Sequence, residues 1–574
     1  MQDLLDTIKA ISNETRMEIL QWLKDPENNF PPHKEVDGFG DGVCLAFIQE
    51  KAELSQSTAS QHMSILTKAG LVIPKKIGKW TYFKRDESGI HKFSTFLSGQ
   101  LESSAVVTDD KESLQRRMFK ELGDESLFQK AMSAGFKYLD KALDRNVYPS
   151  VEALADLTVF EEAMPAHTGS GHEVIEMLEK YGSPATVAQV GGRYYGFVNG
   201  SMVPASLAAK NLSIYWDQNT AMQVISPLSS KLEVVVQRWL VDLFGLPKQT
   251  VAGFVSGTSM ANFCALAAAR YRVLKRQGWD INEKGLAGAP PIKVVTGRQA
   301  HSTILKAIAL MGFGRDNIIW VDTDDQGRII PDAIPPLDEQ SILILQAGNV
   351  NTGSFDPFNK ICRSAVAQGA WIHIDGAFGL WAGATKELKH LTADFEYAHS
   401  WAVDGHKTLN TPYDSGIVLC ADEEALASSL HMSGGYIIKG DERDGMYYTP
   451  EMSRRARIIE LWAALKYLGR DGVNEMIVGF NQRAQQFAEL LKEIDGFTVL
   501  NDVVFNQVLV QCETDELTKK VIKNVQELRD CWVGGSSWEG RPVIRVSICS
   551  WTTTEEDIER SVASFGKALR MSKS

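Results

Sequence analysis

Five short apolar runs between residues 292 and 420 constrain the fold of this chain more than any other feature. None of them alternates apolar with polar residues, and stretches with helical spacing separate them. They are IKVVT (292–296), NIIWV (317–321), SILILQ (341–346), WIHID (371–375) and SGIVLC (415–420). Such runs are typical of strands in a parallel sheet that carries helices on both faces. We therefore predict an α/β fold.

The length of the chain predicts more than one domain. Its 574 residues exceed the roughly 250–300 residues at which a single hydrophobic core stops growing. The composition changes at a charge-rich joint around Thr108–Arg117, and the final part of the chain returns to a helix–strand pattern. We predict a first domain over 1–100, a helical linker segment over 101–190, a large α/β domain over 191–470 and a small α/β domain over 471–574.

Charge and cysteine content narrow the partners and the compartment. The net charge of −12 means that most of the surface repels nucleic acid, so a DNA contact would need a local basic patch. The seven cysteines form no CxxC pair, which argues against a disulfide framework or a metal site and favours a reducing compartment. No signal-peptide core and no membrane-spanning apolar stretch is visible. We expect a cytoplasmic protein without a membrane contact.

Residues 43–87 have the pattern of a DNA-binding unit. We predict a helix, a tight turn and a second helix that starts near Ser55–Ser57, followed by a β-hairpin around Gly78. Short polar side chains at a helix start can contact base edges and phosphates, because the first turn enters the major groove. Basic side chains decorate the hairpin. The predicted DNA-binding residues are Ser57, Thr58, Ser60, Gln61, Lys75, Lys76 and Lys79.

This segment resembles the winged helix-turn-helix of ArsR-type bacterial repressors. The resemblance rests on LSQSTASQHMSILTKAGLV (54–72) and the basic hairpin that follows it. It implies binding to double-stranded DNA and pairing into dimers. The sensor cysteine pair of many such repressors is absent, with Cys44 alone in that region, so we do not expect soft-metal sensing. The alternative is a winged helix kept for dimerisation only.

Lys407 is the first candidate for catalysis. It lies in SWAVDGHKTLNTPYDSGIVL (400–419) between two apolar runs, where an unpaired lysine is rarely tolerated. A lysine there makes sense if it forms an imine with an aldehyde cofactor. Asp375 ends the run WIHID, and a carboxylate at a strand end can keep a pyridine nitrogen protonated, so that the ring acts as an electron sink. The alternative for Asp375 is a cap of the next helix.

Two further motifs fit a phosphate and an aromatic ring. FVSGTSMANFCALAAAR (254–270) puts Thr258 and Ser259 at a helix start, where backbone amides and hydroxyls can bind phosphate. RQAHSTILKA (298–307) puts His301 at another helix start, where its imidazole could stack on one ring face with Ala377 on the other. Each motif alone is weak, because small residues and histidines are common at helix starts.

Together the motifs resemble the group II pyridoxal-dependent decarboxylases, which include aromatic-amino-acid, glutamate and histidine decarboxylases. The resemblance covers about 450 residues and includes GFVNGS (196–201), WDQN (216–219), QAGNVNTGSFDP (346–357) and EMSRRARIIELWAAL (451–465). It implies the type I fold of pyridoxal 5′-phosphate (PLP)-dependent transferases, PLP as cofactor, an amino-acid substrate, and a homodimer or larger homo-oligomer with the active site between subunits.

The resemblance also implies roles for single residues. The cofactor contacts are Thr258 and Ser259 to the phosphate, His301 and Ala377 on the two ring faces, Thr352 beside the ring, Asp375 at the pyridine nitrogen, His406 near the phosphate, and Lys407 at the imine. Phe197 and Asn199 fall on the substrate-pocket strand. The neighbouring residues suggest either a polar or an aromatic pocket, so the identity of the amino acid stays open.

The proton donor departs from the family pattern. Members often use a tyrosine on the loop before the SRR motif, and a gapless count back from Arg454–Arg455 puts Gly445 at that position. Tyr447 and Tyr448 are the nearest substitutes, with loop packing as the alternative for both. We therefore predict an amino-acid decarboxylase, with two alternatives: a transcription regulator whose PLP domain senses an amino acid or PLP, and a PLP-dependent aldehyde-forming oxidase or other carbon–carbon lyase.

Overall fold

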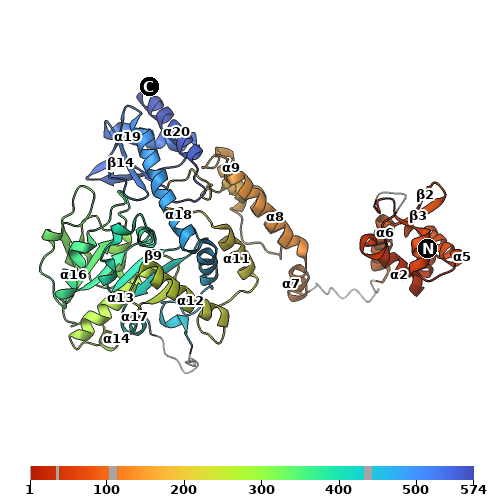
Figure 1. Ribbon diagram of the computed structural model, residues 1–574, viewed down its shortest axis with the longest axis horizontal. Coiled ribbons are helices and arrows are strands. Elements are labelled where there is room, and N and C mark those ends of the chain that lie inside the picture. Colours follow the sequence, from red (N-terminus) through yellow and green to blue (C-terminus); the bar gives the residue numbers. More distant parts are fainter. Residues whose placement is uncertain (1, 34–37, 102–112, 432–441) are drawn as a thin grey trace. The chain divides into compact units, whose positions relative to one another are not determined.

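The computed structural model describes residues 2–33, 38–101, 113–431 and 442–574. The chain divides into two compact units, Met1–Met118 and Phe119–Ser574, and Figure 1 shows both, coloured along the sequence. Among the described residues, no helix combines the length and the apolar character that crossing a membrane requires.

The first unit is a winged helix-turn-helix, as predicted. Its three strands are ordered β1-β3-β2, and Gly78, at φ +59°, makes the turn between β2 and β3. Ser55 caps α5, because its Oγ accepts the amide hydrogen of Thr58 (3.2 Å). Its elements are α1 (Gln2–Ile11), α2 (Glu14–Trp22), α3 (Pro26–Asn29), β1 (Val43–Cys44), α4 (Leu45–Lys51), α5 (Gln56–Lys68), β2 (Val72–Ile77), β3 (Trp80–Arg85) and α6 (Glu87–Leu101).

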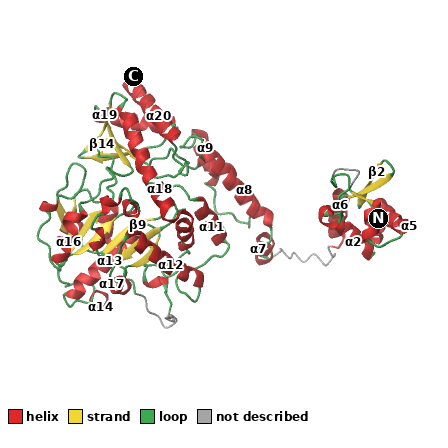
Figure 2. Ribbon diagram, viewed as in Figure 1, coloured by secondary structure: helices red, strands yellow, loops and turns green. Residues whose placement is uncertain are grey.

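A seven-stranded sheet forms the centre of the second unit (Figure 2). Its order is β4-β10-β9-β8-β7-β5-β6. The five strands from β5 to β9 are parallel to one another. The strands are β4 (Val251–Val255), β5 (Lys293–Gly297), β6 (Ile318–Val321), β7 (Ser341–Gln346), β8 (Trp371–Asp375), β9 (Ser400–Asp404) and β10 (Gly416–Cys420). The α/β prediction is confirmed.

The expectation that all five apolar runs are parallel is wrong for the last one. β10 lies antiparallel to both of its neighbours, β9 and β4. Residues 405–415 join β9 to β10, and a parallel crossover needs a dozen or more residues, usually with a helix. The chain therefore turns back directly, and this short connection carries Lys407.

Both faces of the sheet are buried along its inner strands. Along β7, Leu343 and Leu345 face one apolar cluster, and Ile342 and Ile344 face the other. α13 covers the second face, where it contacts β8, β9 and β10. The surrounding helices are α12 (Pro227–Phe244), α13 (Thr258–Arg276), α14 (Ile281–Lys284), α15 (Ser302–Leu310), α16 (Phe358–Ala367), α17 (Glu423–Ser429) and α18 (Ile458–Lys492). This double coverage explains why the strands are apolar throughout.

A four-stranded antiparallel sheet, ordered β11-β12-β14-β13, forms the C-terminal part. Its strands are β11 (Phe497–Val499), β12 (Gln507–Cys512), β13 (Gly534–Trp538) and β14 (Arg541–Ser547), and its helices are α19 (Asp515–Leu528) and α20 (Glu555–Lys573). Thr554 and Asp557 form a capping box that starts α20.

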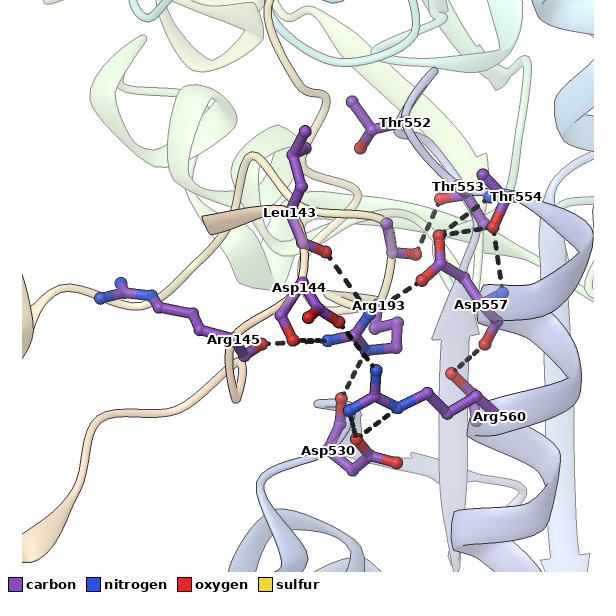
Figure 3. A network of polar contacts seen from close by, with 12 residues as sticks. Leu143, Asp144, Arg145, Arg193, Asp530, Thr552, Thr553, Thr554, Asp557 and Arg560 are labelled. Atoms are coloured by element: carbon purple, nitrogen blue, oxygen red, sulfur yellow. Dashed lines mark hydrogen bonds and ion pairs between the residues drawn. The ribbon is translucent and has the colours of Figure 1, made fainter. Parts of the chain in front are cut away.

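Arg193 ties the helices that precede the large sheet to this C-terminal part (Figure 3). These helices are α7 (Leu114–Leu122), α8 (Glu125–Ala142), α9 (Val151–Ala155), α10 (Gly171–Met177) and α11 (Pro204–Ile214). The Arg193 guanidinium is 3% exposed and donates to the carbonyl oxygens of Asp144 and Arg145 just after α8, and to Asp557 Oδ1 (2.9 Å) in α20. It also donates to the carbonyl oxygen of Asp530 (2.9 Å).

Candidate active site

The predicted cofactor residues gather at one edge of the large sheet. Each follows the carboxyl end of β4, β5, β7, β8 or β9, and these five strands point the same way, since β10 is antiparallel to both β4 and β9. In open α/β sheets, ligands bind outside the carboxyl ends of the strands. The fold therefore turns motifs scattered over 150 residues of sequence into one site.

Lys407 has a buried acidic partner that the sequence analysis missed. Asp404, 2% exposed at the end of β9, places Oδ2 3.3 Å from Lys407 Nζ and 3.6 Å from His406 Nε2. His406 Nδ1 accepts the amide hydrogen of Ser415 (3.0 Å), so its proton is on Nε2 and faces Asp404. The sequence pattern that could have indicated this pair is an acidic residue at the end of an apolar strand, three residues before the lysine.

The start of α13 offers a cradle for a phosphate. The Thr258 hydroxyl is buried and has no partner among the described residues, while Ser259 is exposed. The Thr258 amide donates to Asp404 Oδ1 (2.6 Å). A buried hydroxyl without a partner is costly, and a phosphate oxygen at this helix start would satisfy it.

Asp375 is buried at the end of β8. Burial raises the pKa of its carboxyl group to about 6, against the opposing effects of the Lys407 charge and the Ala377 amide, which donates to Asp375 Oδ1 (3.3 Å). A positively charged ring nitrogen would lower that pKa again and keep the carboxylate ionised. Asp375 thus suits a pyridine nitrogen chemically.

His301 caps α15, and its Nδ1 accepts the amide hydrogen of Thr303 (3.3 Å). Burial lowers the pKa of His301 to about 4, helped by the charges of Lys407 and Arg545, so the ring is neutral and can stack on an aromatic cofactor. Arg545, in β14, is a second residue that the sequence analysis missed. Its buried Nε has no partner among the described residues. A charged residue inside the apolar run VIRVSIC was the signal.

The expectation that Phe197 and Asn199 lie on a strand is wrong, because Phe197 (φ +53°) is in a turn and Asn199 follows that turn, before α11. Phe197 is 64% exposed and stacks on Trp532, with ring centroids 5.6 Å apart. Asn199 Oδ1 accepts the hydroxyl hydrogen of Tyr413 (2.9 Å), and the Tyr413 ring stacks on His406 at 4.2 Å. Tyr413 is the third residue of the site that the sequence analysis did not single out.

Three predicted residues have contacts elsewhere in the chain. The Thr352 side chain is fully buried and donates to the carbonyl oxygen of Gln326 (2.7 Å). Tyr448 donates to Glu423 Oε1 (2.6 Å), and Tyr447 stacks on His431 at 6.0 Å. Their roles beside the cofactor and in proton transfer stay predictions.

The predicted DNA-binding residues of the first unit lie on α5 and the β2–β3 hairpin. Ser57, Ser60 and Gln61 are exposed, as are the three lysines of the hairpin. Thr58 is half-buried and contacts the cap residue Ser55. Lys75 pairs with Asp41, and Lys79 lies over the Trp80 ring.

Comparison with known proteins decides the family. Residues 160–512 match the model of the pyridoxal-dependent decarboxylase conserved domain. The chain belongs to the pyridoxal-dependent decarboxylase family. Its cofactor is therefore pyridoxal 5′-phosphate, and Lys407, Asp375, His301 and Thr258 have the chemistry to hold it.

Two curated relatives match stretches of different length in this chain. Acidic amino acid decarboxylase GADL1 of Mus musculus is 26% identical over 317 residues, which is 53% of this chain and 57% of that protein. The chain thus spans little more than half the length of that relative. The HTH-type transcriptional regulator YbzH of Bacillus subtilis is 47% identical over 97 residues, 17% of this chain and 97% of YbzH.

The fold of the second unit is that of solved PLP decarboxylases. The crystal structure of Oryza sativa TDC with PLP and tryptamine matches with a TM-score of 0.71 and 21% identity, over 78% of this chain and 97% of that one. The prediction of a type I PLP fold joined to a winged helix-turn-helix is confirmed.

Proposed function

We propose that the chain decarboxylates an L-amino acid, with Lys407 as the cofactor anchor. The observation that carries this proposal is the convergence of Thr258, His301, Asp375 and Lys407 at the carboxyl edge of one sheet. Bound PLP supplies an electron sink for the bond to the leaving carboxyl group. Asp375 would keep the ring nitrogen protonated and His301 would stack on the ring, while Asp404 holds the Lys407 ammonium before the cofactor binds.

Arg545 is the residue we expect to attract a carboxylate of the substrate. Its guanidinium is largely buried, and burial lowers its pKa, yet no ion pair with a described carboxylate offsets this cost. Its positive charge helps to lower the pKa of His301, and we place His301 against the cofactor ring. Phe197 and Asn199 would contact the rest of the substrate, whose side chain stays open.

Two measurements test the decarboxylase proposal. The purified protein with PLP should absorb near the visible edge, and Lys407→Ala should remove that band. Carbon dioxide release from a panel of the twenty amino acids then separates an enzyme from a sensor: one productive amino acid supports turnover. A band without release from any of them would favour the alternative, in which the PLP domain senses an amino acid or PLP for the winged helix.

Aldehyde formation is the other alternative, and Gly445 favours it. Gly445 stands where the family resemblance puts the loop tyrosine. Analysis of the organic product, as amine or aldehyde, separates simple decarboxylation from an aldehyde-forming reaction with the same substrate.

We propose further that the first unit binds double-stranded DNA. Its similarity to YbzH, a regulator by name, and the exposed side chains of Ser57, Ser60 and Gln61 support this. In a retardation assay with the full chain, the triple change of Lys75, Lys76 and Lys79 to alanine should weaken binding and reduce its salt dependence. An absence of wild-type binding at low salt would leave the dimerisation alternative.

A homodimer is the assembly we propose for the second unit. An apolar groove of about 770 Å³ between α8 and α11 is lined by Phe128, Met132, Phe136, Leu139, Leu212 and Tyr215. Phe136, Leu212 and Tyr215 are each more than half exposed, and an apolar patch of this kind marks an interaction surface. Sedimentation of wild type and Phe136→Asp should show a dimer that the charge dissociates.

A further inference from the structure

Gly445 cannot be replaced by a tyrosine in this fold. The residue is buried, and a Cβ atom there would collide with Arg454 Nη2 and lie 2.8 Å from the carbonyl oxygen of Thr220. Moving the Arg454 side chain away would break its ion pair with the fully buried Glu233 (2.8 Å), which would cost stability. A proton donor for this site must therefore come from another position.

Tyr413 offers a hydroxyl in the connection that carries Lys407. Its ring stacks on His406, with centroids 4.2 Å apart and planes 29° from parallel. Its hydroxyl donates to Asn199 Oδ1 (2.9 Å), and Gln189 Oε1 accepts from Asn199 Nδ2 (3.1 Å). These contacts hold the hydroxyl in a fixed place. The residue is still 47% exposed, so solvent can reach it.

The hydroxyl lies between the two walls of the site. One wall is His406–Lys407. The other is the segment of Phe197 and Asn199, which touches the first wall, because a Cβ on Gly200 would collide with the Lys407 carbonyl oxygen and lie 2.9 Å from that of His406. A substrate amine that replaces Lys407 on the cofactor and lies along this segment would pass beside Tyr413, which contacts both His406 and Asn199.

The electrostatic surroundings keep this hydroxyl protonated. Burial raises the pKa of Tyr413, and the neighbouring Asp404, Cys549 and Tyr194 raise it further. A phenol with a raised pKa is a weak acid, so it can give its proton only to a strong base, such as a carbon atom that gains an electron pair, and its hydrogen bond to Asn199 must open first.

We propose that Tyr413 donates the proton that replaces the carboxyl group on the substrate α-carbon. The bond from the α-carbon to the carboxyl group breaks and carbon dioxide leaves without its electrons. The electron pair then forms the new bond to the hydrogen of Tyr413, and solvent returns a proton to the phenolate oxygen. This assignment rests on the proposed decarboxylase function.

The test uses the full-length holoenzyme and an amino acid from which wild type releases carbon dioxide. Tyr413→Phe keeps the ring on His406, so the cofactor absorbance and its change on substrate addition should stay as in wild type. Amine formation should fall by about 100-fold or more, the range of a lost general acid. Tyr397→Phe, a surface tyrosine under Arg363, is the matched control and should keep wild-type rates.

The stereochemistry of deuterium incorporation in heavy water is a further measurement, and it would not change if Tyr413 served only in packing. Wild type should place deuterium on one face of the α-carbon of the amine, and Tyr413→Phe should give a mixture, because water then supplies the deuterium. Asn199→Ala frees the hydroxyl without removing it and should give a smaller loss. It also keeps the assignment testable if Tyr413→Phe fails to fold.

Two results would overturn the assignment. One is a Tyr413→Phe enzyme that keeps rate and stereochemistry while Tyr447→Phe or Tyr448→Phe loses them. The other is a wild-type protein that releases no carbon dioxide at all, which removes the decarboxylase function itself and is seen before any variant is compared.

Discussion

Lys407 Nζ lies 3.3 Å from Asp404 Oδ2, within the turn that leaves β9. Asp404 also accepts the amide hydrogen of Thr258 at the start of α13 (2.6 Å). One buried carboxylate thus joins the lysine proposed as the cofactor anchor to the helix start that suits a phosphate. It holds both groups in place before the cofactor binds.

Asp404→Asn should destabilise the cofactor-free protein. Removing one member of a buried ion pair costs about 3 kcal/mol, because the remaining charge stays poorly solvated. Calorimetry of the second unit's unfolding transition measures the shift. Asp338→Asn breaks the exposed pair with Lys293 and should cost about 0–1 kcal/mol; equal shifts for both variants would contradict the buried role of Asp404.

Gly445→Ala should destabilise by about 1–3 kcal/mol, the usual cost of overpacking. The added methyl group meets Arg454 and a backbone carbonyl. Gly479→Ala is the control, since it lies in α18 with nothing within 4 Å of the new Cβ and should stabilise by about 0.5–1 kcal/mol. If the thermal unfolding midpoints of Gly445→Ala and Gly479→Ala shift in the same direction, the predicted collision at Gly445 is wrong.

Arg193→Met should loosen the C-terminal part of the second unit. Loss of the guanidinium leaves the Asp557 carboxylate, 13% exposed, without its partner, at a cost of about 3–5 kcal/mol. Hydrogen exchange should rise at residues 143–145 and at the start of α20. Arg560→Met, whose half-exposed side chain pairs with Asp530, should change exchange far less.

Asp375 should make the cofactor-free protein lose stability as the pH rises. Its pKa is raised from 3.8 to about 6 by burial, so the folded state binds the proton more tightly than the unfolded one. The contribution is complete below pH 3.8 and disappears as the pH passes 6, with a slope of up to about 1.4 kcal/mol per pH unit.

Chemical unfolding at pH 4.5, 5.5 and 6.5 measures that slope. Asp375→Asn should flatten it, while the part that comes from Asp356, whose pKa burial raises to about 7, should remain. An unchanged slope in Asp375→Asn would mean that the carboxyl group titrates normally in the folded protein.

Strand-end residues could be predicted from the sequence, because apolar runs fix where strands end and a common direction brings those ends together. Asp375 was predicted in this way, and Thr258 and His301 were predicted from the helix starts that follow such strands. The antiparallel β10 could not be read from its apolar pattern, since burial on both faces hides direction. The direction of β10 could have been inferred from its connection to β9, because residues 405–415 are too few for a parallel crossover.

Contacts between distant segments were beyond sequence reasoning. Arg545 approaches His301 only because the C-terminal sheet lies beside the large one, and Tyr413 meets Asn199 across 214 residues of sequence. Gly445 shows the limit of counting along a motif: the count named a position, but only the three-dimensional surroundings reveal how little room a side chain would have there.

Arg193 and Asp557 are 364 residues apart in sequence, which sets an order of events during synthesis. A ribosome adds about 5–20 residues per second, so roughly 20 to 70 seconds separate the translation of the two partners. Throughout that interval Arg193 can donate to the carbonyl oxygens of Asp144 and Arg145 but lacks its carboxylate partner. The contacts around Arg193 are therefore complete only after α20 has been synthesised, and a chain cut short before α20 should be more open to a protease at residues 143–145.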